Sequence, residues 1–167
     1  MCIRDSCSGS GAIAVALDKI SGAKVTAVEI DETAFSYLET NVKENNSSVK
    51  PVMADALEIC DTFADGELDL IVSNPPYIKS ADIETLQKEV RLEPRLALDG
   101  GEDGYDFYRE IVSRWSRKLK KGGALAFELG ENQADAVKAL MTDKGFSNFK
   151  ISLDFGGVQR AIIGTLL

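Results

Sequence analysis

Short apolar runs rich in β-branched residues recur along the chain at positions that predict strands. The clearest are residues 24–29, 68–73, 124–128 and 159–166. Amphipathic stretches lie between them; in one, Ala34, Leu38 and Val42 recur at four-residue steps, the spacing of one helix face. These stretches predict helices over residues 11–20, 32–45, 105–119 and 132–144. Apolar strands alternating with helices indicate an α/β protein whose sheet is parallel and covered on both faces.

The end of the chain breaks this alternation. The last two predicted strands are separated only by residues 154–157, which cannot hold a crossover helix, so the final pair is expected to be antiparallel. The sequence therefore predicts a mostly parallel sheet with a reversed C-terminal strand. No repeat or linker interrupts the pattern, and residues 1–167 are expected to form a single domain.

The beginning of the chain fits the pattern poorly. A first strand is expected to lead into the small-residue loop that starts at Cys7, but only residues 1–6 precede that loop. One of them is Arg4, at a position where a buried strand favours an aliphatic residue. We therefore expect this strand to be truncated or irregular, and the chain to be a fragment whose true N-terminus lies upstream.

Composition narrows the class of protein. Hydrophobic residues make up 44% of the chain and charged residues 28%, the balance of an ordinary globular domain. No apolar run approaches the ~20 residues needed to cross a bilayer, and residues 1–6 do not resemble a secretory signal, so no membrane contact is expected. Three cysteines without metal-ligand spacing and the absence of histidine favour a cytoplasmic location and argue against a metal site.

The formal net charge is −8, opposite in sign to that of most proteins that bind nucleic acid through its phosphates. Direct binding of nucleic acid is therefore not expected. One local cluster of basic residues is interpreted as the solvated end of a helix, where cations complement the helix dipole. It comprises Arg114, Arg117, Lys118, Lys120 and Lys121.

A loop of small residues follows the first predicted strand and leads into the first helix. Glycine permits a tight turn and a close approach of a ligand to the backbone, and the helix N-terminus offers free N–H groups to a carboxylate or phosphate. The spacing Gly9-x-Gly11-x-x-Ala14 also fits a dinucleotide fingerprint or an ordinary tight turn. The candidate cofactor-binding residues of this loop are Cys7, Ser8, Gly9, Ser10 and Gly11.

Acidic residues follow the next two strands, at points where nucleoside ligands bind. Glu29 ends the second strand and can accept hydrogen bonds from both ribose hydroxyls. The alternative is a charge near the start of the next helix, with Asp31 as the helix cap. Asp55, with Ala56, follows the third strand and is a candidate for contact with adenine; a solvated loop aspartate is the alternative.

The segment Asn74-Pro75-Pro76-Tyr77 comes directly off the fourth strand, at the sheet edge where open α/β folds bind ligands. An amide or aryl amine nitrogen is a poor nucleophile because its lone pair is delocalised. The Asn74 side-chain oxygen and the Pro75 carbonyl can accept from its two N–H groups and favour the charge that develops on nitrogen. Pro75 and Pro76 add rigidity, and Tyr77 offers a flat face to a planar group. The pattern favours methyl transfer to a planar nitrogen; a rigid surface turn is the alternative.

Several segments resemble the release-factor glutamine methyltransferases. Asn-Pro-Pro-Tyr itself also occurs in adenine-N6 methyltransferases of DNA and RNA, so it indicates the chemistry and not the substrate. The resemblance covers the chain from Asp5 onward. Its more specific segments are residues 89–98, residues 100–104, residues 127–130 with Gln133, and the ending Asp154-x-x-Gly157-x-x-Arg160.

This resemblance implies a class I S-adenosylmethionine-dependent methyltransferase of Rossmann-like fold. The implied reaction is N5-methylation of the glutamine in the Gly-Gly-Gln motif of peptide chain release factors. The family's helical N-terminal domain is absent from this sequence. The implied cofactor is S-adenosyl-L-methionine, bound by Cys7, Ser8, Gly9, Ser10, Gly11, Glu29, Asp55, Ala56 and Asn74, with substrate contacts from Asn74, Pro75, Pro76 and Tyr77.

Other functions compete with this one. Within the same enzyme class, the alternative is a ribosomal-protein glutamine or nucleic-acid adenine-N6 methyltransferase. A nucleotide-dependent dehydrogenase would share the glycine-rich loop but leaves the tetrapeptide unexplained, and a non-catalytic scaffold is a third class. The long segment of residues 78–104 is expected to be either a lid or partner-binding surface, or a structural connector.

Overall fold

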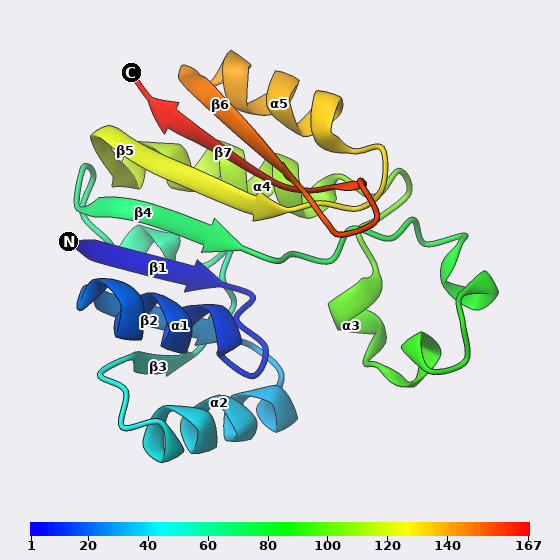
Figure 1. Cartoon of the computed structure of the whole chain (residues 1–167), viewed down its shortest axis with the longest axis horizontal. Helices are drawn as coiled ribbons and strands as arrows, with labels where there is room; N and C mark the ends of the chain where they lie inside the picture. Colours follow the sequence, from blue (N-terminus) through cyan, green and yellow to red (C-terminus); the bar gives the residue numbers. More distant parts are fainter.

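The computed structural model describes all 167 residues, and its centre is a seven-stranded sheet in the order β3-β2-β1-β4-β5-β7-β6 (Figure 1). β1, β2, β3, β4 and β5 pair in parallel, whereas β7 is antiparallel to both β5 and β6. The predicted α/β class and the reversed C-terminal strand are therefore confirmed. The strands are β1 (Cys2–Ser6), β2 (Lys24–Glu29), β3 (Lys50–Met53), β4 (Leu68–Ser73), β5 (Leu119–Glu128), β6 (Phe146–Leu153) and β7 (Gln159–Leu166).

Helices cover both faces of the sheet (Figure 1). On one face, α1 (Ala12–Ser21) and α2 (Glu32–Glu44) lie over β1 and β2, around a small core that includes Ile3, Ala14, Val25, Ala27 and Leu38. On the other face lie α4 (Asp106–Trp115) and α5 (Ala134–Asp143). The larger core on that side includes Tyr108, Ile111, Trp115, Leu125, Phe127, Val137 and Met141.

The predicted helices agree with the structure except at their ends. The largest difference is at α4, which ends at Trp115 and continues as a 3₁₀ turn, η4 (Ser116–Lys118), where the prediction had one helix to residue 119. None of the helices combines the length and the apolar character that a membrane-spanning helix needs.

The basic cluster after α4 is only partly solvated. Lys118 is buried, contrary to the prediction, and its ammonium donates to the Phe63 carbonyl and to Asp65 at 2.7 and 2.8 Å. A buried ammonium needs such partners because it has left water. The cluster therefore ties the end of α4 to the segment before β4. Its other ion pairs join Arg114 to Glu110, Arg117 to Asp61 and to Asp65, and Lys120 to Asp69.

β1 is short, but its pairing with β2 and β4 is regular. Arg4 lies at its centre and is fully buried, and no nitrogen of its guanidinium has a hydrogen-bond partner. The guanidinium lies between two aromatic rings, 4.7 Å from the centroid of Phe63 and 4.3 Å from that of Trp115. Burial lowers the pKa of Arg4 to about 9. In place of hydrogen bonds, the buried charge has cation–π contacts with these two rings.

Residues 78–99 form an arm that projects beyond the edge at which β1, β4 and β5 end (Figure 1). The arm contains η2 (Ile83–Thr85), η3 (Val90–Leu92) and the short helix α3 (Arg95–Leu98). Its two ends are joined, because Ile78 N–H donates to the Leu98 carbonyl at 3.0 Å and Gly100 N–H donates to the Ile78 carbonyl at 2.7 Å. The arm is thus closed at its base, beside the predicted catalytic segment.

Candidate active site

A cavity of about 750 Å³ opens where the parallel strands end. Its walls are the loop after β1, the turn after β3, the tetrapeptide after β4 and the arm. The structure thus brings together the two groups of residues that the sequence predicts for cofactor and substrate. Those that line the cavity are Cys7, Ser8, Gly9, Ser10, Glu29, Asp55, Ala56, Asn74, Pro75, Pro76 and Tyr77.

Gly11 is the predicted residue that does not line the cavity. Its φ is +80°, and a Cβ at this position would clash with the side chain of Leu38 in α2. Gly9 differs, since its φ is +53° but a Cβ would meet no other atom within 4 Å. Gly11 is therefore required for close packing of the two helices, whereas Gly9 leaves the cavity wall open.

Glu29 holds the loop in place. Its Oε2 accepts a hydrogen bond from Gly9 N–H at 2.7 Å, and its Oε1 accepts from Ile30 and Asp31 N–H at 2.9 Å. A carboxylate has about four acceptor sites, so capacity is left for a ligand hydroxyl. The helix cap is Asp31, which accepts from Ala34 N–H at 2.8 Å. Glu29 itself is not the cap.

The turn after β3 presents a carboxylate to the cavity. Asp55 Oδ1 accepts from Leu57 N–H at 2.7 Å, and the Asp55 carbonyl accepts from Ile59 N–H at 3.0 Å. No protein group donates to Asp55 Oδ2. The turn is also fixed to β2, since Ala54 N–H donates to the Glu29 carbonyl at 3.0 Å. Asp55 is therefore ordered, with one oxygen free.

The tetrapeptide offers two unoccupied acceptors. Asn74 is exposed in the cavity, and its side chain makes no hydrogen bond to another protein group. Pro75 and Pro76 are buried, and no backbone N–H donates to the Pro75 carbonyl. Tyr77 is half-buried, and burial raises the pKa of its phenol. A planar NH₂ group in this cavity would find the Asn74 amide oxygen and the Pro75 carbonyl free to accept from it.

The sequence matches the family model described as "Methyltransferase small domain" over residues 2–93. The chain belongs to this family. It is similar to curated proteins named "Release factor glutamine methyltransferase". The protein from Geobacter sulfurreducens is 42% identical over 160 residues, covering 95% of this chain and 55% of that protein. The protein from Bradyrhizobium diazoefficiens is 41% identical over 167 residues, covering 96% and 54%. The chain spans about half the length of these relatives.

Solved structures agree on the fold of this methyltransferase domain. A methyltransferase from Pyrococcus furiosus superposes with a TM-score of 0.75 at 24% identity, covering 98% of this chain and 73% of that chain. The predicted class I methyltransferase fold is confirmed. The family and the fold together imply use of S-adenosyl-L-methionine.

The charge of the cavity fits this cofactor. Its lining includes Glu29, Asp31, Asp55 and Glu93 and no lysine or arginine. A cavity lined by one sign of charge attracts ligands of the opposite sign. S-adenosyl-L-methionine carries a sulfonium and an ammonium, whereas a dinucleotide carries an anionic pyrophosphate. The acidic lining therefore suits the methyltransferase cofactor better than the cofactor of a dehydrogenase.

Gln133, at the start of α5, supports the backbone of the tetrapeptide in this methyltransferase domain. It is buried at the N-terminus of α5 and donates from Nε2 to the Tyr77 carbonyl at 3.0 Å. Gly100 also lies against this backbone, since a Cβ there would come within 2.9 Å of the Pro76 carbonyl oxygen. The sequence singled out Gln133 only by resemblance, without a role. The predicted helix began at residue 132, so the local pattern did not mark Gln133 as the residue directly before α5.

The arm adds a cavity wall that the sequence did not assign. Its segment was noted through the resemblance, but no side chain in it was placed at the site. Its elements, η2, η3 and α3, have only three or four residues each and no usable periodicity, so neither its fold nor the side facing the cavity could be predicted. The arm residues that line the cavity are Ile78, Val90, Glu93, Pro94, Leu96, Ala97 and Leu98.

Proposed function

We propose that this chain carries the catalytic domain of an S-adenosylmethionine-dependent methyltransferase that acts on the side-chain nitrogen of glutamine. Its proposed substrate is the Gly-Gly-Gln glutamine of a peptide chain release factor, which would place the protein in the cytoplasm. One observation carries the proposal: Asn74 and Pro75 present free acceptors inside an acidic cavity. The names of the relatives support the choice of substrate.

The cofactor is assigned to the side of the cavity formed by β1, β2 and β3. The start of α1 has no acidic residue in its first turn, so its free N–H groups suit the carboxylate of the cofactor. The methionine part of the cofactor would lie along Cys7, Ser8, Gly9 and Ser10. Glu29 has capacity for a ribose hydroxyl, and Asp55 with Ala56 would receive adenine.

The substrate is assigned to the tetrapeptide. When bound, the cofactor supplies an electrophilic methyl group on a sulfonium that is already a good leaving group. Asn74 Oδ1 and the Pro75 carbonyl would each accept from one N–H of the glutamine amide and stabilise the charge that develops on nitrogen. The ring of Tyr77 would pack on the planar amide. No histidine is needed for this chemistry, and the chain contains none.

The alternative substrate, adenine in nucleic acid, is less compatible with the site. An adenine N6 group would suit the same two acceptors, but its phosphodiester chain would approach a cavity lined by four carboxylates and by no basic side chain. A glutamine on a protein loop brings no such charge. The acidic lining therefore favours a protein substrate.

A methyl-transfer assay tests the proposal. The chain is incubated with methyl-labelled S-adenosyl-L-methionine and a release factor, or a peptide with the Gly-Gly-Gln loop, beside matched substrates carrying alanine for that glutamine. Label is expected only in the glutamine substrates. Equal labelling of the alanine forms, or transfer to an adenine oligonucleotide instead, would overturn the substrate assignment.

A further inference from the structure

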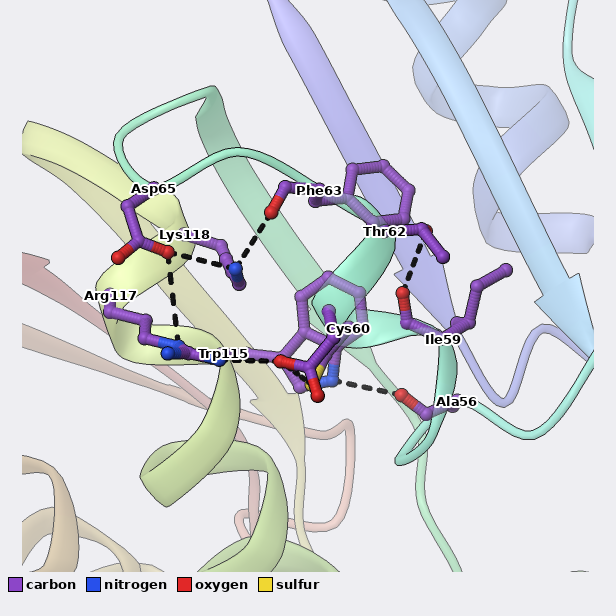
Figure 2. Close-up of polar contacts among 10 residues, drawn as sticks. Ala56, Ile59, Cys60, Thr62, Phe63, Asp65, Trp115, Arg117 and Lys118 are labelled. Carbon is purple, nitrogen blue, oxygen red and sulfur yellow. Dashed lines mark hydrogen bonds and ion pairs between the residues drawn. The ribbon is translucent and has the colours of Figure 1, made fainter.

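The indole of Trp115 reaches Ala56, in the turn that follows β3 (Figure 2). Its Nε1 donates a hydrogen bond of 3.0 Å to the carbonyl of Ala56, a residue of that turn. We propose that Trp115 is a positioning residue for the adenine end of the cofactor, because it holds the Asp55–Ala56 turn in the conformation that receives the base. This inference rests on the cofactor assignment above.

The hydrogen bonds within the turn and to β2 involve Ala54 and Asp55, and none of them reaches the Ala56 carbonyl. β3 has only four residues and lies at the edge of the sheet, paired with β2 alone. The chain then passes into a single 3₁₀ turn, η1 (Ile59–Thr62). The contacts from the β2 side fix Ala54, but they leave the Ala56 carbonyl without a partner. The bond from Trp115 is the link between this carbonyl and the helix layer on the other face.

Trp115 is itself held firmly. It is the last residue of α4 and is fully buried. Its ring packs on Phe63 at a centroid distance of 5.4 Å. The guanidinium of Arg4, from β1, lies 4.3 Å from the centroid of the Trp115 ring. Arg117 and Lys118, which follow shortly after Trp115, both form ion pairs with Asp65 in the segment between η1 and β4 (Figure 2). The indole is thus a fixed donor, suited to setting the position of the Ala56 carbonyl.

Loss of this donor would act on the cavity through the backbone. Ala56 is itself buried, so a carbonyl left without a partner favours movement of the turn toward another donor or toward water. Asp55 adjoins it, and its free Oδ2 would move as well. Only the fraction of molecules with the turn in place would then bind adenine well. A merely structural role would instead change folding stability without changing which base is preferred.

The test is the variant Trp115→Phe, which keeps a buried ring and removes the N–H. Calorimetry measures the affinity for S-adenosylhomocysteine and for S-inosylhomocysteine, whose hypoxanthine lacks the amino group that Asp55 would recognise. The affinity for the adenine ligand is expected to fall about fivefold, the equivalent of one ordinary hydrogen bond, and the preference over hypoxanthine to shrink. A matched control is Phe146→Leu, in the same core but at the start of the outermost strand β6, where the preference should be unchanged.

A second measurement needs no variant, because Trp115 is the one tryptophan of the chain. S-adenosylhomocysteine is expected to change its fluorescence, and the inosine analogue to change it less. An unchanged affinity and preference in Trp115→Phe, or no response of the fluorescence at saturating ligand, would overturn the inference. Failure of the wild-type chain to bind S-adenosylhomocysteine would instead overturn the cofactor assignment on which it rests.

Discussion

The side-chain nitrogen of Gln133 donates to the main-chain carbonyl of Tyr77 at 3.0 Å, which joins α5 to the end of the tetrapeptide. The rest of the amide is also occupied. Its Nε2 donates to the Gly104 carbonyl at 3.3 Å, and its Oε1 accepts from Gly130 N–H at 2.9 Å and from the Tyr108 hydroxyl at 3.2 Å. With 7% of its surface exposed, Gln133 fixes the tetrapeptide relative to the end of β5 and to α4.

We predict that Gln133→Glu lowers kcat more than it weakens cofactor binding. The substitution keeps the acceptor for Gly130 but removes both donors, so the carbonyls of Tyr77 and Gly104 face a carboxylate. The tetrapeptide would lose its register with the bound substrate, and kcat is expected to fall about tenfold, as for loss of one to two hydrogen bonds. Steady-state kinetics and calorimetry with S-adenosylhomocysteine separate the two effects.

A control for this prediction is Glu131→Gln, two residues away in the sequence. Glu131 is exposed and makes no hydrogen bond or ion pair, so kcat should be unchanged. If Gln133→Glu keeps its kcat and loses cofactor affinity, Gln133 does not position the catalytic segment.

We predict that Asn74→Ala abolishes most of the catalytic rate. The side chain is exposed and makes no hydrogen bond to the protein, so the variant should fold normally. Loss of one acceptor in the transition state is expected to raise the barrier by about 2 to 4 kcal/mol. Asn74→Asp is the matched comparison, because it retains an acceptor oxygen and should retain more activity. Single-turnover methyl transfer measures both, and an unchanged rate for Asn74→Ala would remove it from the mechanism.

The predicted residues that line the cavity lie at or directly after strand ends. Glu29 and Asn74 each follow an apolar run, and parallel strands bring their carboxyl ends to one edge, so local pattern was enough. The link from Trp115 to Ala56 joins residues 59 apart, and the link from Gln133 to Tyr77 joins residues 56 apart. The sequence pattern placed Trp115 within the predicted helix of residues 105–119, but such a pattern cannot say which backbone carbonyl its N–H meets.

Arg4 shows a different limit. The pattern required an aliphatic residue in the central strand and therefore predicted an irregular strand. The structure keeps regular pairing and places the guanidinium between Phe63 and Trp115 instead. Those two aromatic residues lie more than fifty positions away, so no local signal connects them with β1. Tertiary contacts, and not the local sequence, therefore allow β1 to hold an arginine while its pairing stays regular.

We predict that Arg4→Leu stabilises the fold. The guanidinium is fully buried without a hydrogen-bond partner, and cation–π contacts of roughly 2 kcal/mol do not offset the cost of removing a charge from water. Leucine fits the apolar surroundings of a central strand, and the free energy of unfolding is expected to rise by about 1 to 4 kcal/mol.

Urea denaturation at neutral pH measures the effect of Arg4→Leu. Arg114→Ala is a suitable control, because this arginine lies on the same side of the sheet but is exposed, paired only with Glu110. Its removal should change the free energy of unfolding by no more than about 0.5 kcal/mol. A lower stability of Arg4→Leu would show that the aromatic contacts outweigh the desolvation cost.

The last prediction concerns Asp5, which adjoins Arg4 in β1 but lies on the α1 side of the sheet. It is fully buried, neither of its carboxyl oxygens has a hydrogen-bond partner, and burial raises its pKa from 3.8 to about 7. Between these values the folded chain holds a proton that the unfolded chain has released. Stability is therefore expected to fall as the pH rises from about 4 to about 7.

The change in stability over this pH range is simple to interpret, because the chain contains no histidine that would titrate there. The free energy of unfolding, measured in urea at pH 5 and pH 7, should be lower at pH 7 in the wild-type chain. Asp5→Asn should remove most of that difference, since asparagine carries no charge at either pH. Asp18→Asn is the contrasting control, because hydrogen bonds from Ser47 and Ser48 lower the pKa of Asp18 to about 2. The stability that ionised Asp18 contributes is lost only as the pH falls below about 4. The Asp18→Asn variant should therefore keep the wild-type difference in the free energy of unfolding between pH 5 and pH 7. An Asp5→Asn variant with an unchanged difference would mean that Asp5 is ionised throughout and finds a partner in solution.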